Sequence, residues 1–509
     1  MTRANLPPPN HSHLQLKRLG IDTYREFVIY MNRDCDVCRS EGFEVRSRIA
    51  VGLNGRSIVA TLNVTGGDLL STHEAGLSEA AWKALAAEEG QIVDLSHPSP
   101  LVSESHLRKK VYGGTLGKDE LEHIVRDVAD GLYDDIHLAA FVTACAGDRL
   151  DARETIDLTA AMISAGDTLS WQSSRVADKH CIGGLPGNRT SMIVVPIVAA
   201  AGLVIPKTSS RAITSPAGTA DVMETLTRVD LNLAEMKRVV EQEGGCIAWG
   251  GAMRLSPADD ILIGVERPLD FDSEGQLVAS VLSKKIAAGS THVVLDLPVG
   301  PTAKLRNAEA AARLAARLKH TADAFGLTVE IVETDGTQPV GRGIGPVLEA
   351  RDVLAVLQNE HAAPSDLRLR ALTLSGRLLE LAGAAAPGGG LVLAESLLSN
   401  GAAWRKFQSI CAAQGGMRGL TFAPHRHDVV ALRTGQVTSI DNRKLAKVAK
   451  LAGAPRAPMA GVDFLAPLGS AAKIGQPIYT VHAETPGELA YALDYAKSQP
   501  GLIEVGEPT

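Results

Sequence analysis

Two loops rich in glycine, serine and threonine carry the residues with the clearest chemistry in this chain. The first loop, from Asp178 to Asn188, offers the ammonium group of Lys179 and several glycines. The second, from Ser209 to Thr219, offers hydroxyl groups and the guanidinium group of Arg211. Glycines let a backbone approach a ligand closely, and amides and hydroxyls grouped in such loops donate hydrogen bonds to anions. The two loops together predict one phosphate group held from both sides.

An apolar run positions these loops. Residues from Met192 to Leu203 predict a buried helix, and its N-terminus, next to Ser191, would direct amide dipoles at the bound anion. A second helix is expected from about Asp221. A single short cluster of glycine or serine is usually only a turn or a helix cap. Two clusters that each contain a basic residue are a more specific signal.

A second group of polar residues lies between Asp259 and Lys304. Ser280 and Lys284 are four residues apart, so they lie one turn apart on the same face of a predicted helix. A hydroxyl and an ammonium so placed can bind a base that carries carbonyl groups. The alternative is a solvated helix face on which these residues have no ligand.

The motifs resemble those of a known family. The string SSRAITSPAGTADVME and the string DKHCIGG resemble motifs of the thymidine and pyrimidine-nucleoside phosphorylases, and the resemblance spans roughly residues 100 to 490. The form GGLPGN is similar to the longer branch, which includes archaeal AMP phosphorylases and bacterial proteins named as thymidine phosphorylases. The resemblance implies a pentosyltransferase that uses inorganic phosphate as co-substrate, with no cofactor and no metal. The implied reaction converts thymidine and phosphate to thymine and 2-deoxyribose 1-phosphate.

The resemblance also implies a role for individual residues. The implied phosphate-binding residues are Lys179, Cys181, Gly183, Gly184, Ser191, Ser209 and Thr219. The implied substrate-binding residues are Ser210, Arg211, Ala212, Ile213, Thr214, Ser215, Arg267, Ser280 and Lys304. The implied catalytic residues, which would meet the leaving base with a proton or a positive charge, are Asp272, His180 and Lys284.

Two positions depart from the short thymidine phosphorylases. Cys181 replaces a phosphate-binding serine, and because a thiol is a poor donor the backbone must supply part of the phosphate contacts. Lys304 lies at or near a position where those enzymes place an aromatic residue against the base. A lysine pairs well with a phosphate, so the alternative substrate is a nucleoside 5′-monophosphate such as AMP, with ribose 1,5-bisphosphate and free base as products.

Two other function classes remain open at this stage. An anthranilate-type phosphoribosyltransferase shares the helical plus α/β plan, but it would need an acidic pair near the loops to bind magnesium. The segment from Gly183 to Thr219 contains no Asp or Glu. A non-catalytic scaffold that keeps the fold is the other alternative, although the candidate lysines and hydroxyls are present.

Composition and length agree with a large enzyme. The chain has 509 residues, more than one core usually supports, and its net charge of -7 provides no basic field for nucleic acid. Neither a signal peptide nor a membrane-spanning run is expected, and six scattered cysteines favour reduced thiols. We therefore expect a cytoplasmic protein that binds a small-molecule substrate and no membrane, and that forms a homodimer or a larger homo-oligomer.

Strand candidates that begin at Thr291 and Leu327, with an alanine-rich helix between them, predict a βαβ unit with a parallel sheet. Leu121, Ile124, Val125 and Val128 recur at helical spacing, as on one face of a helix.

The predicted fold class is α/β. We expect a disordered tail over 1–13, a β-rich domain over 14–95 and a helical domain over 100–167, followed by an α/β phosphate-binding domain over 168–415 and a C-terminal α+β domain over 420–509. Asn54 and Gly55 predict a hairpin turn in the first of these domains. Cys35 and Cys38 form a lone CxxC there, without the second half of a zinc site, so ordinary thiols are the simpler interpretation.

Overall fold

The computed structural model describes residues 13–212, 215–269 and 273–507. The tail predicted over residues 1–13 lies, except for His13, outside the described residues. The chain divides into two compact units, Met1–Ala144 and Cys145–Thr509, which we describe separately. The division falls inside the predicted helical domain, and the domain boundaries given above stay predictions.

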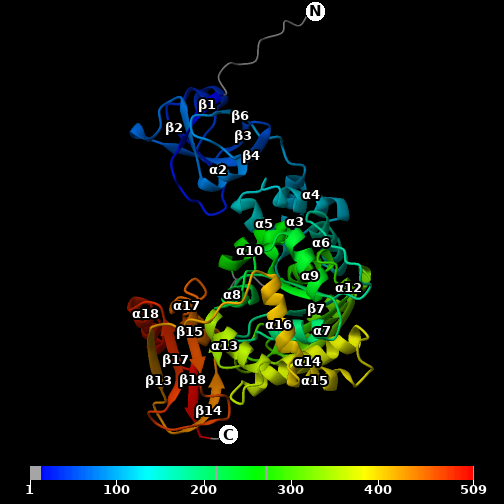
Figure 1. Cartoon of the computed structure of the whole chain (residues 1–509). Helices are drawn as coiled ribbons and strands as arrows, with labels where there is room; N and C mark the ends of the chain where they lie inside the picture. The colour runs from blue at the N-terminus through cyan, green and yellow to red at the C-terminus, as the bar shows by residue number, and fades with distance from the viewer. Residues whose placement is uncertain (1–12, 213–214, 270–272, 508–509) are drawn as a thin grey trace, which may run out of the picture. The chain divides into compact units, whose positions relative to one another are not determined.

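The first unit contains a closed β-barrel with the strand order β1-β5-β2-β4-β3-β6 (Figure 1). Its strands are β1 (His13–Arg18), β2 (Val28–Asn32), β3 (Arg48–Leu53), β4 (Arg56–Thr65), β5 (Glu74–Leu77) and β6 (Ile92–Ser96). Asn54 and Gly55 have φ of 50° and 78°, and Leu53 pairs with Arg56 across them, which confirms the predicted hairpin. Alternate residues such as Leu14 and Leu16 point into the barrel core.

Short helices accompany the barrel, and longer ones follow it. They are α1 (Asp36–Glu41), α2 (Glu79–Leu85), α3 (Ser103–Val111), α4 (Lys118–Ala129) and α5 (Asp135–Cys145). In α4 the apolar residues predicted to lie on one face, including Leu121, Ile124 and Val128, are buried. Cys35 and Cys38 lie at the start of α1 and inside it, and both thiols belong to the barrel core.

The second unit is built around parallel strands. β7 (Ala177–Cys181), β10 (His292–Val299) and β11 (Thr328–Asp335) form a sheet in the order β11-β10-β7, and β8 (Ile205–Ser209) pairs with β9 (Gly245–Trp249). A bridge between Val176 and Val204 places β7 beside β8. The helix α12 (Ala308–Ala324) connects β10 to β11, so the predicted βαβ unit with a parallel sheet is confirmed.

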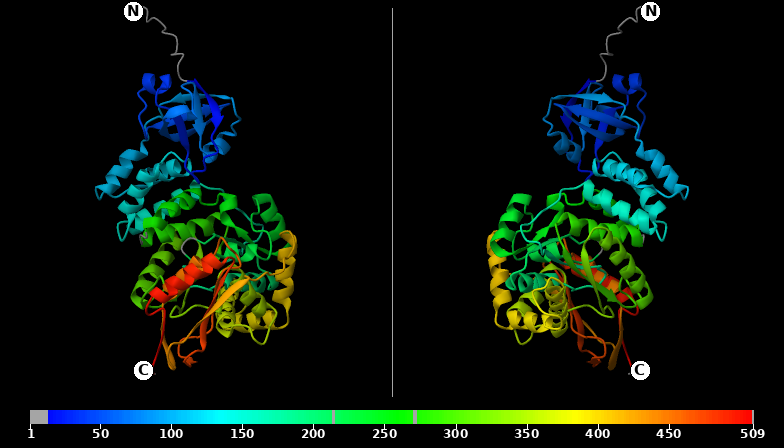
Figure 2. Two further views of the ribbon diagram at one scale, coloured as in Figure 1. Left: turned by 90° about the vertical axis from the view of Figure 1, so that its left-hand side faces the viewer. Right: turned by 90° about the vertical axis from the view of Figure 1, so that its right-hand side faces the viewer.

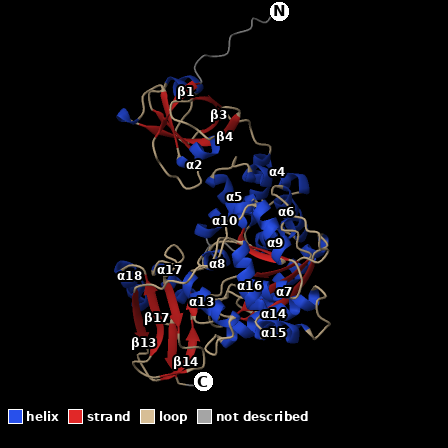
Figure 3. Ribbon diagram, in the orientation of Figure 1, coloured by secondary structure: helices blue, strands red, loops and turns tan. Residues whose placement is uncertain are grey.

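Helices cover both faces of this sheet (Figure 3). On β10, Val293, Leu295 and Leu297 pack with α11 (Glu274–Ala287) and α12, whereas Val294 belongs to the core of the opposite face. The other helices of this part are α6 (Ala152–Ser164), α7 (Ser191–Ala200), α8 (Thr219–Glu224), α9 (Leu233–Glu243), α10 (Pro257–Leu269), α13 (Pro346–Leu357), α14 (Ser365–Leu381), α15 (Gly390–Ser399) and α16 (Ala402–Ala413). Because the strands are parallel, the segments that follow β7, β8 and β10 emerge at one edge of the sheet.

The C-terminal segment forms two antiparallel sheets with two helices beside them (Figure 2). Its elements are β13 (His425–Val430), β14 (Gly435–Ile440), α17 (Asn442–Leu451), β15 (Gly461–Phe464), β16 (Ala471–Ala472), β17 (Pro477–Ala483), α18 (Pro486–Ser498) and β18 (Ile503–Gly506). The short strand β12 (Gly343–Ile344), which precedes α13 in the chain, pairs with β15 and extends one of the two sheets. The Asn442 amide donates hydrogen bonds to Thr302 and to the Gly336 carbonyl, so this segment contacts the ends of β10 and β11.

The observed architecture agrees with the predicted fold class, since it combines a β-barrel, helices, a parallel α/β part and a C-terminal α+β part. Within the described residues, none of the helices has both the length and the apolar character that a membrane span requires.

Candidate active site

The first loop leaves the end of β7, and the residues around it hold Lys179 in place. The Lys179 ammonium donates a hydrogen bond of 2.7 Å to the Thr190 hydroxyl and lies 3.5 Å from a carboxylate oxygen of Asp296. Its side chain is only 1% exposed. Burying an ammonium group costs free energy unless it is paired, and Asp296 in β10 provides that pairing. The structure therefore places the predicted phosphate ligand Lys179 at the junction of loop, sheet and helix α7.

Cys181, at the end of β7, accepts hydrogen bonds through its sulfur atom and does not act as the donor that a serine would be at this position. Its sulfur atom accepts a bond of 3.4 Å from the Gly183 amide and one of 3.3 Å from the Asn188 side chain. Burial, together with the charge of Asp296, raises the pKa of the Cys181 thiol to about 12. The thiol is therefore neutral at physiological pH, and the loop amides remain the stronger donors to an anion.

Two glycines of this loop allow close approach of other chain segments. A Cβ atom on Gly184, where φ is +81°, would lie 2.8 Å from the backbone nitrogen of Lys304. A Cβ atom on Gly187 would lie 2.1 Å from the Val340 carbonyl oxygen. Real Cβ atoms do not come so close, so neither position accommodates a side chain without movement. The contact at Gly184 brings the predicted substrate residue Lys304 against the predicted phosphate loop.

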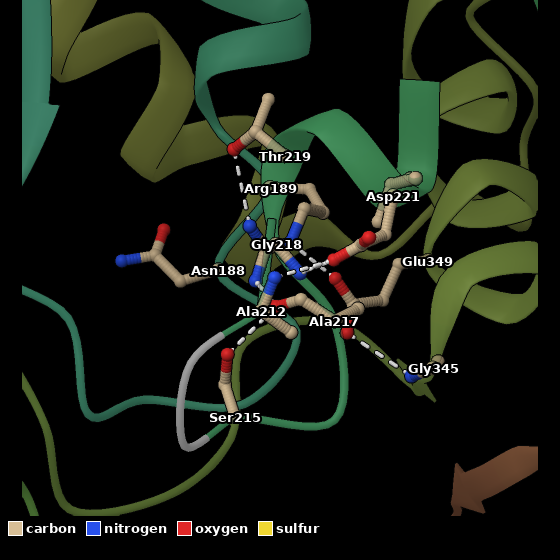
Figure 4. Close-up of polar contacts among 12 residues, drawn as sticks. Asn188, Arg189, Ala212, Ser215, Ala217, Gly218, Thr219, Asp221, Gly345 and Glu349 are labelled. Carbon is tan, nitrogen blue, oxygen red and sulfur yellow. Dashed lines mark hydrogen bonds and ion pairs between the residues drawn. The ribbon is translucent and has the colours of Figure 1, made fainter. Parts of the chain in front are cut away.

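Arg189 connects the two loops (Figure 4). Its guanidinium group donates a hydrogen bond of 3.1 Å to the Thr219 hydroxyl and one of 2.8 Å to the Ala217 carbonyl, both in the second loop. The same group forms an ion pair with the carboxylate of Glu349 in α13. Glu349 in turn accepts a 3.0 Å bond from the Gly345 amide. The structure thus brings together the two loops that the sequence predicts to act on one anion.

Asp221 gives the second loop its shape. One carboxylate oxygen accepts hydrogen bonds from the backbone amides of Ala212 (2.6 Å) and Gly218 (2.8 Å). The Arg211 guanidinium group, predicted to bind substrate, forms an ion pair with Glu224 and stacks over the Trp249 ring at 4.9 Å. In this structure Arg211 is therefore held by protein groups, and it helps to fix the loop.

The remaining predicted hydroxyls lie along the same edge of the sheet. Ser191 is the first residue of α7 and Thr219 the first of α8, so both stand at helix N-termini, where amides favour anions. Ser209 is the last residue of β8, and its hydroxyl donates a hydrogen bond of 3.2 Å to the Ser210 carbonyl. The Ser215 hydroxyl donates 2.9 Å to the Ala217 carbonyl.

His180 lies next to Lys179 in a strongly basic environment. Burial lowers the pKa of its imidazole well below the usual value, and the charges of Lys285, Lys207, Lys179 and Lys284 lower it further. His180 is therefore neutral at physiological pH. In this form it can donate a hydrogen bond but carries no positive charge for a leaving base.

The helices α10 and α11 bring Lys284 against two acidic residues. The Lys284 ammonium forms an ion pair with Asp259 and lies 3.9 Å from Asp260. Glu266, two turns along α10 from Asp259, has a pKa raised to about 7, first by burial and then by the charge of Asp259, while Lys304 and Lys284 oppose this rise. Ser280 lies on α11 with Lys284, as the sequence predicts. A carboxyl group that changes charge near neutral pH thus lies within the field of a predicted catalytic residue, Lys284, and a predicted substrate residue, Lys304.

Some predicted site residues cannot be placed. Ile213, Thr214 and Asp272 lie outside the described residues. Arg267 belongs to α10, but its side chain is outside the described set as well. The roles of these residues stay predictions.

Sequence reasoning missed several residues that build the site. Arg189, Glu349 and Asp296 hold the loops, Asp178 and Lys207 lie beneath them, and Glu266 lies beside Lys284 and Lys304. The local signal for some of them was a single basic residue close to a loop, such as Lys207 two residues before Ser209. Among the residues that the structure describes, no group of three or more His, Cys, Asp or Glu side chains is arranged to hold a metal ion.

Comparison with known proteins agrees with this geometry. Residues 104–166 match the family described as "Glycosyl transferase family, helical bundle domain", and residues 173–404 match "Glycosyl transferase family, a/b domain". The chain is 62% identical over 494 residues to a protein of a Polaromonas species named "Putative thymidine phosphorylase", with 97% of each chain covered. It is 61% identical over 496 residues to "Putative thymidine phosphorylase 2" of an Acidovorax species, again with 97% of each chain covered.

One solved structure shares part of the fold. The anthranilate phosphoribosyltransferase of Thermus thermophilus superimposes with a TM-score of 0.51 at 20% sequence identity, over 61% of this chain and 99% of that one. At this identity the likeness concerns the fold alone. The helical and α/β family matches and the near full-length relatives show that the chain belongs to the thymidine phosphorylase-like glycosyl transferase family and is an enzyme of the pentosyltransferase class.

Proposed function

We propose that this enzyme cleaves the N-glycosidic bond of a nucleoside with inorganic phosphate as the nucleophile. The observation that carries the proposal is the coupling of the two loops by Arg189, which sets amides and hydroxyls from both at one edge of the parallel sheet. In open α/β sheets this edge, at the carboxyl ends of the strands, is where ligands bind. The near full-length relatives are named "Putative thymidine phosphorylase" and "Putative thymidine phosphorylase 2", which supports thymidine as the substrate.

In the proposed reaction an oxygen atom of phosphate attacks C1′ of the pentose while the base departs. The carbon–nitrogen bond breaks, a carbon–oxygen bond forms with inversion, and the product is an α-pentose 1-phosphate. The proposed phosphate ligands are Lys179, Cys181, Ser191, Ser209, Thr219 and the amides of Gly183 and Gly184. Holding phosphate in line with C1′ can contribute on the order of 7 kcal/mol or more to lowering the barrier.

The departing base carries negative charge, so a proton or a cation must meet it. Ser280 and Lys284 are proposed to face the base, with Lys284 as the cation. Asp272 is proposed as a proton donor. His180 is neutral, so its proposed part is a hydrogen bond to the sugar or the base rather than transfer of an acidic proton.

A nucleoside 5′-monophosphate, such as AMP, is the second candidate substrate. Lys304 supports it, because the backbone of this residue lies against Gly184 of the phosphate loop and its positive charge acts on Glu266. An ammonium group pairs well with a second phosphate group. In this version of the reaction the products are ribose 1,5-bisphosphate and the free base.

Base release from thymidine, uridine, AMP, CMP and UMP, each with and without phosphate, tests both candidates. Phosphate-dependent release is expected from at least one of these compounds. Replacing Lys304 with Met should weaken a 5′-phosphorylated substrate more than its nucleoside, whereas Lys319→Met, at an exposed position on α12, should affect neither. An equal loss for nucleotide and nucleoside would remove the nucleotide candidate.

The cytoplasm is the proposed location and a homodimer or larger assembly the proposed state. The six cysteines all lie among the described residues and form no disulfide there, which supports a reducing compartment. Light scattering of the purified chain measures the assembly directly, and a monomeric mass would contradict this part of the proposal.

A further inference from the structure

A cluster of buried charges lies beneath the two loops and has no part in the reaction proposed above. The two carboxylate oxygens of Asp178 face two lysines: the Lys285 ammonium at 2.7 Å and the Lys207 ammonium at 3.3 Å. The side chains of Asp178, Lys285 and Lys207 are 0%, 3% and 4% exposed. Two ammonium groups therefore share one carboxylate away from water.

This cluster joins the elements that carry the proposed ligands. Asp178 lies in β7 directly before Lys179, and it also accepts a 2.7 Å bond from the Lys179 amide. Lys207 lies in β8, two residues before Ser209, and its ammonium group donates a hydrogen bond of 2.9 Å to the Thr208 carbonyl. Lys285 follows Lys284 in α11. The cluster thus joins β7 and β8, from whose ends the two loops leave, to the helix that carries Lys284.

The groups around Lys207 come from several elements. From β7 it is faced by Asp178, Lys179 and the neutral His180, from α11 by Lys285, and from β9 by Cys246, whose thiol is neutral because burial raises its pKa. Burial lowers the pKa of Lys207 to about 7, with Lys285 adding to this effect and Asp178 opposing it. Two buried ammonium groups that share one carboxylate repel each other, which favours loss of a proton from Lys207 while the loops are empty.

We propose that Lys207 and Lys285, held by Asp178, form an electrostatic anchor for the phosphate bound by the two loops, and that Lys207 takes up a proton from solvent when the anion binds. The inference rests on the proposed phosphorolytic function. An anion nearby favours the charged form of an amine, so the empty site holds Lys207 partly neutral and the occupied site holds it charged. Lys207 does not touch phosphate in this account, and it acts as a positioning residue.

Sulfate is the probe for the test, because its charge does not change between pH 6.5 and 8.5. Affinity should fall about tenfold over this range, since each proton taken up on binding makes affinity depend on pH. Calorimetry at pH 7.5 in two buffers of different ionisation enthalpy counts the proton directly. The full-length parent chain should take up a fraction of a proton per sulfate, and zero uptake would overturn the proposal even without a variant.

Substitutions test whether Lys207 is the residue that takes up the proton when sulfate binds. Lys207→Met keeps the volume of the side chain and leaves Asp178 paired with Lys285, so its affinity for sulfate should be independent of pH and equal to that of the parent at pH 8.5. At pH 6.5 the parent should bind about tenfold more tightly than this variant. Lys319→Met is the matched control, because Lys319 is an exposed lysine on α12, and this variant should keep the pH dependence of the parent. A Lys207→Met variant that keeps this dependence would contradict the proposal.

The outcome also separates this proposal from the proposed function. Sulfate binding that is competitive with phosphate but independent of pH would overturn the anchor and leave phosphorolysis standing. No binding of sulfate or phosphate at any pH would overturn both. Lys285→Met gives an independent check, because Lys207 would then have Asp178 to itself and stay protonated, and the pH dependence of sulfate binding should disappear in this range.

Discussion

The guanidinium group of Arg189 and the carboxylate of Glu349 form an ion pair beneath the two loops, with side chains 10% and 0% exposed. The pair connects residues that lie 160 positions apart in the sequence. Through its other nitrogen atoms Arg189 also holds Thr219 and the Ala217 carbonyl. One arginine therefore sets the distance between the loop after β7 and the loop after β8.

Removal of one partner of this pair should be costly. Arg189→Met leaves the buried Glu349 carboxylate unpaired, and we expect a loss of about 3–5 kcal/mol in unfolding free energy, together with a large rise in KM for phosphate. The double variant Arg189→Met/Glu349→Gln should recover part of the melting temperature, because Gln still accepts the Gly345 amide, but not the phosphate affinity. The exposed pair Arg313–Glu309 is the control, and Arg313→Met should change little. A double variant with the parent's phosphate KM would show that Arg189 does not position the loops.

Alanine substitutions at two neighbouring glycines distinguish the effect of backbone strain from the effect of a steric contact with Lys304. Gly183 and Gly184 both have positive φ, of 91° and 81°, so alanine is strained at either position. Only at Gly184 would the new Cβ atom meet Lys304, whereas nothing lies within 4 Å at Gly183. Gly184→Ala should therefore raise KM for the nucleoside or nucleotide more than Gly183→Ala does. Equal effects of the two substitutions on KM would contradict the placement of Lys304 in the site.

Cys181→Ser should strengthen phosphate binding. The neutral thiol accepts bonds from Gly183 and Asn188, and a serine hydroxyl keeps this acceptor while adding a good donor. One neutral hydrogen bond contributes about 1 kcal/mol, so KM for phosphate should fall about fivefold with kcat little changed. Because the pKa of the thiol is about 12, iodoacetamide should modify Cys181 slowly at pH 7.5. Rapid alkylation at this residue would disprove the neutral thiol.

Glu266 should make stability depend on pH. Its pKa is raised from 4.5 to about 7 on folding, so the neutral form stabilises the fold fully below the unfolded pKa and this contribution is lost as pH rises through 7. Glu266→Gln mimics the neutral form. At pH 8 the free energy of unfolding of this variant should exceed that of the parent by at most about 3 kcal/mol, which a higher melting temperature would report. At pH 4.5 the two melting temperatures should be equal.

Glu309→Gln is the matched control for Glu266, because Glu309 is an exposed carboxylate on α12. The loss of its charge should leave the melting temperature unchanged at both pH values. A Glu266→Gln variant that is less stable than the parent at pH 8 would show that Glu266 is ionised and paired in the folded protein.

Local patterns predicted the parts of the site that depend on residue type. The glycines and hydroxyls of both loops, helix α7 and the strands β10 and β11 follow from short-range periodicity and turn chemistry, and the structure has them where they were expected. Parallel pairing of β10 and β11 followed from the helix between them.

Long-range pairing explains what the sequence could not predict. Nothing near Glu349 marks it as the partner of Arg189, and nothing near Asp178 marks Lys285, 107 residues away, as its partner. The parallel pairing of β1 with β5, which helps to close the barrel, also joins strands that are distant in sequence. Such contacts are set by the packing of whole elements, so a single sequence gives no local signal for them.

The fate of the phosphate oxygen atoms shows whether phosphate is the nucleophile. The purified chain is incubated with thymidine or a nucleoside monophosphate and with phosphate labelled with ¹⁸O at every oxygen, and the sugar product is analysed by mass spectrometry. With phosphate as the nucleophile, we expect a pentose 1-phosphate that retains the full label, because the carbon–oxygen bond forms to a phosphate oxygen. Free pentose, or a sugar phosphate without the label, would contradict it.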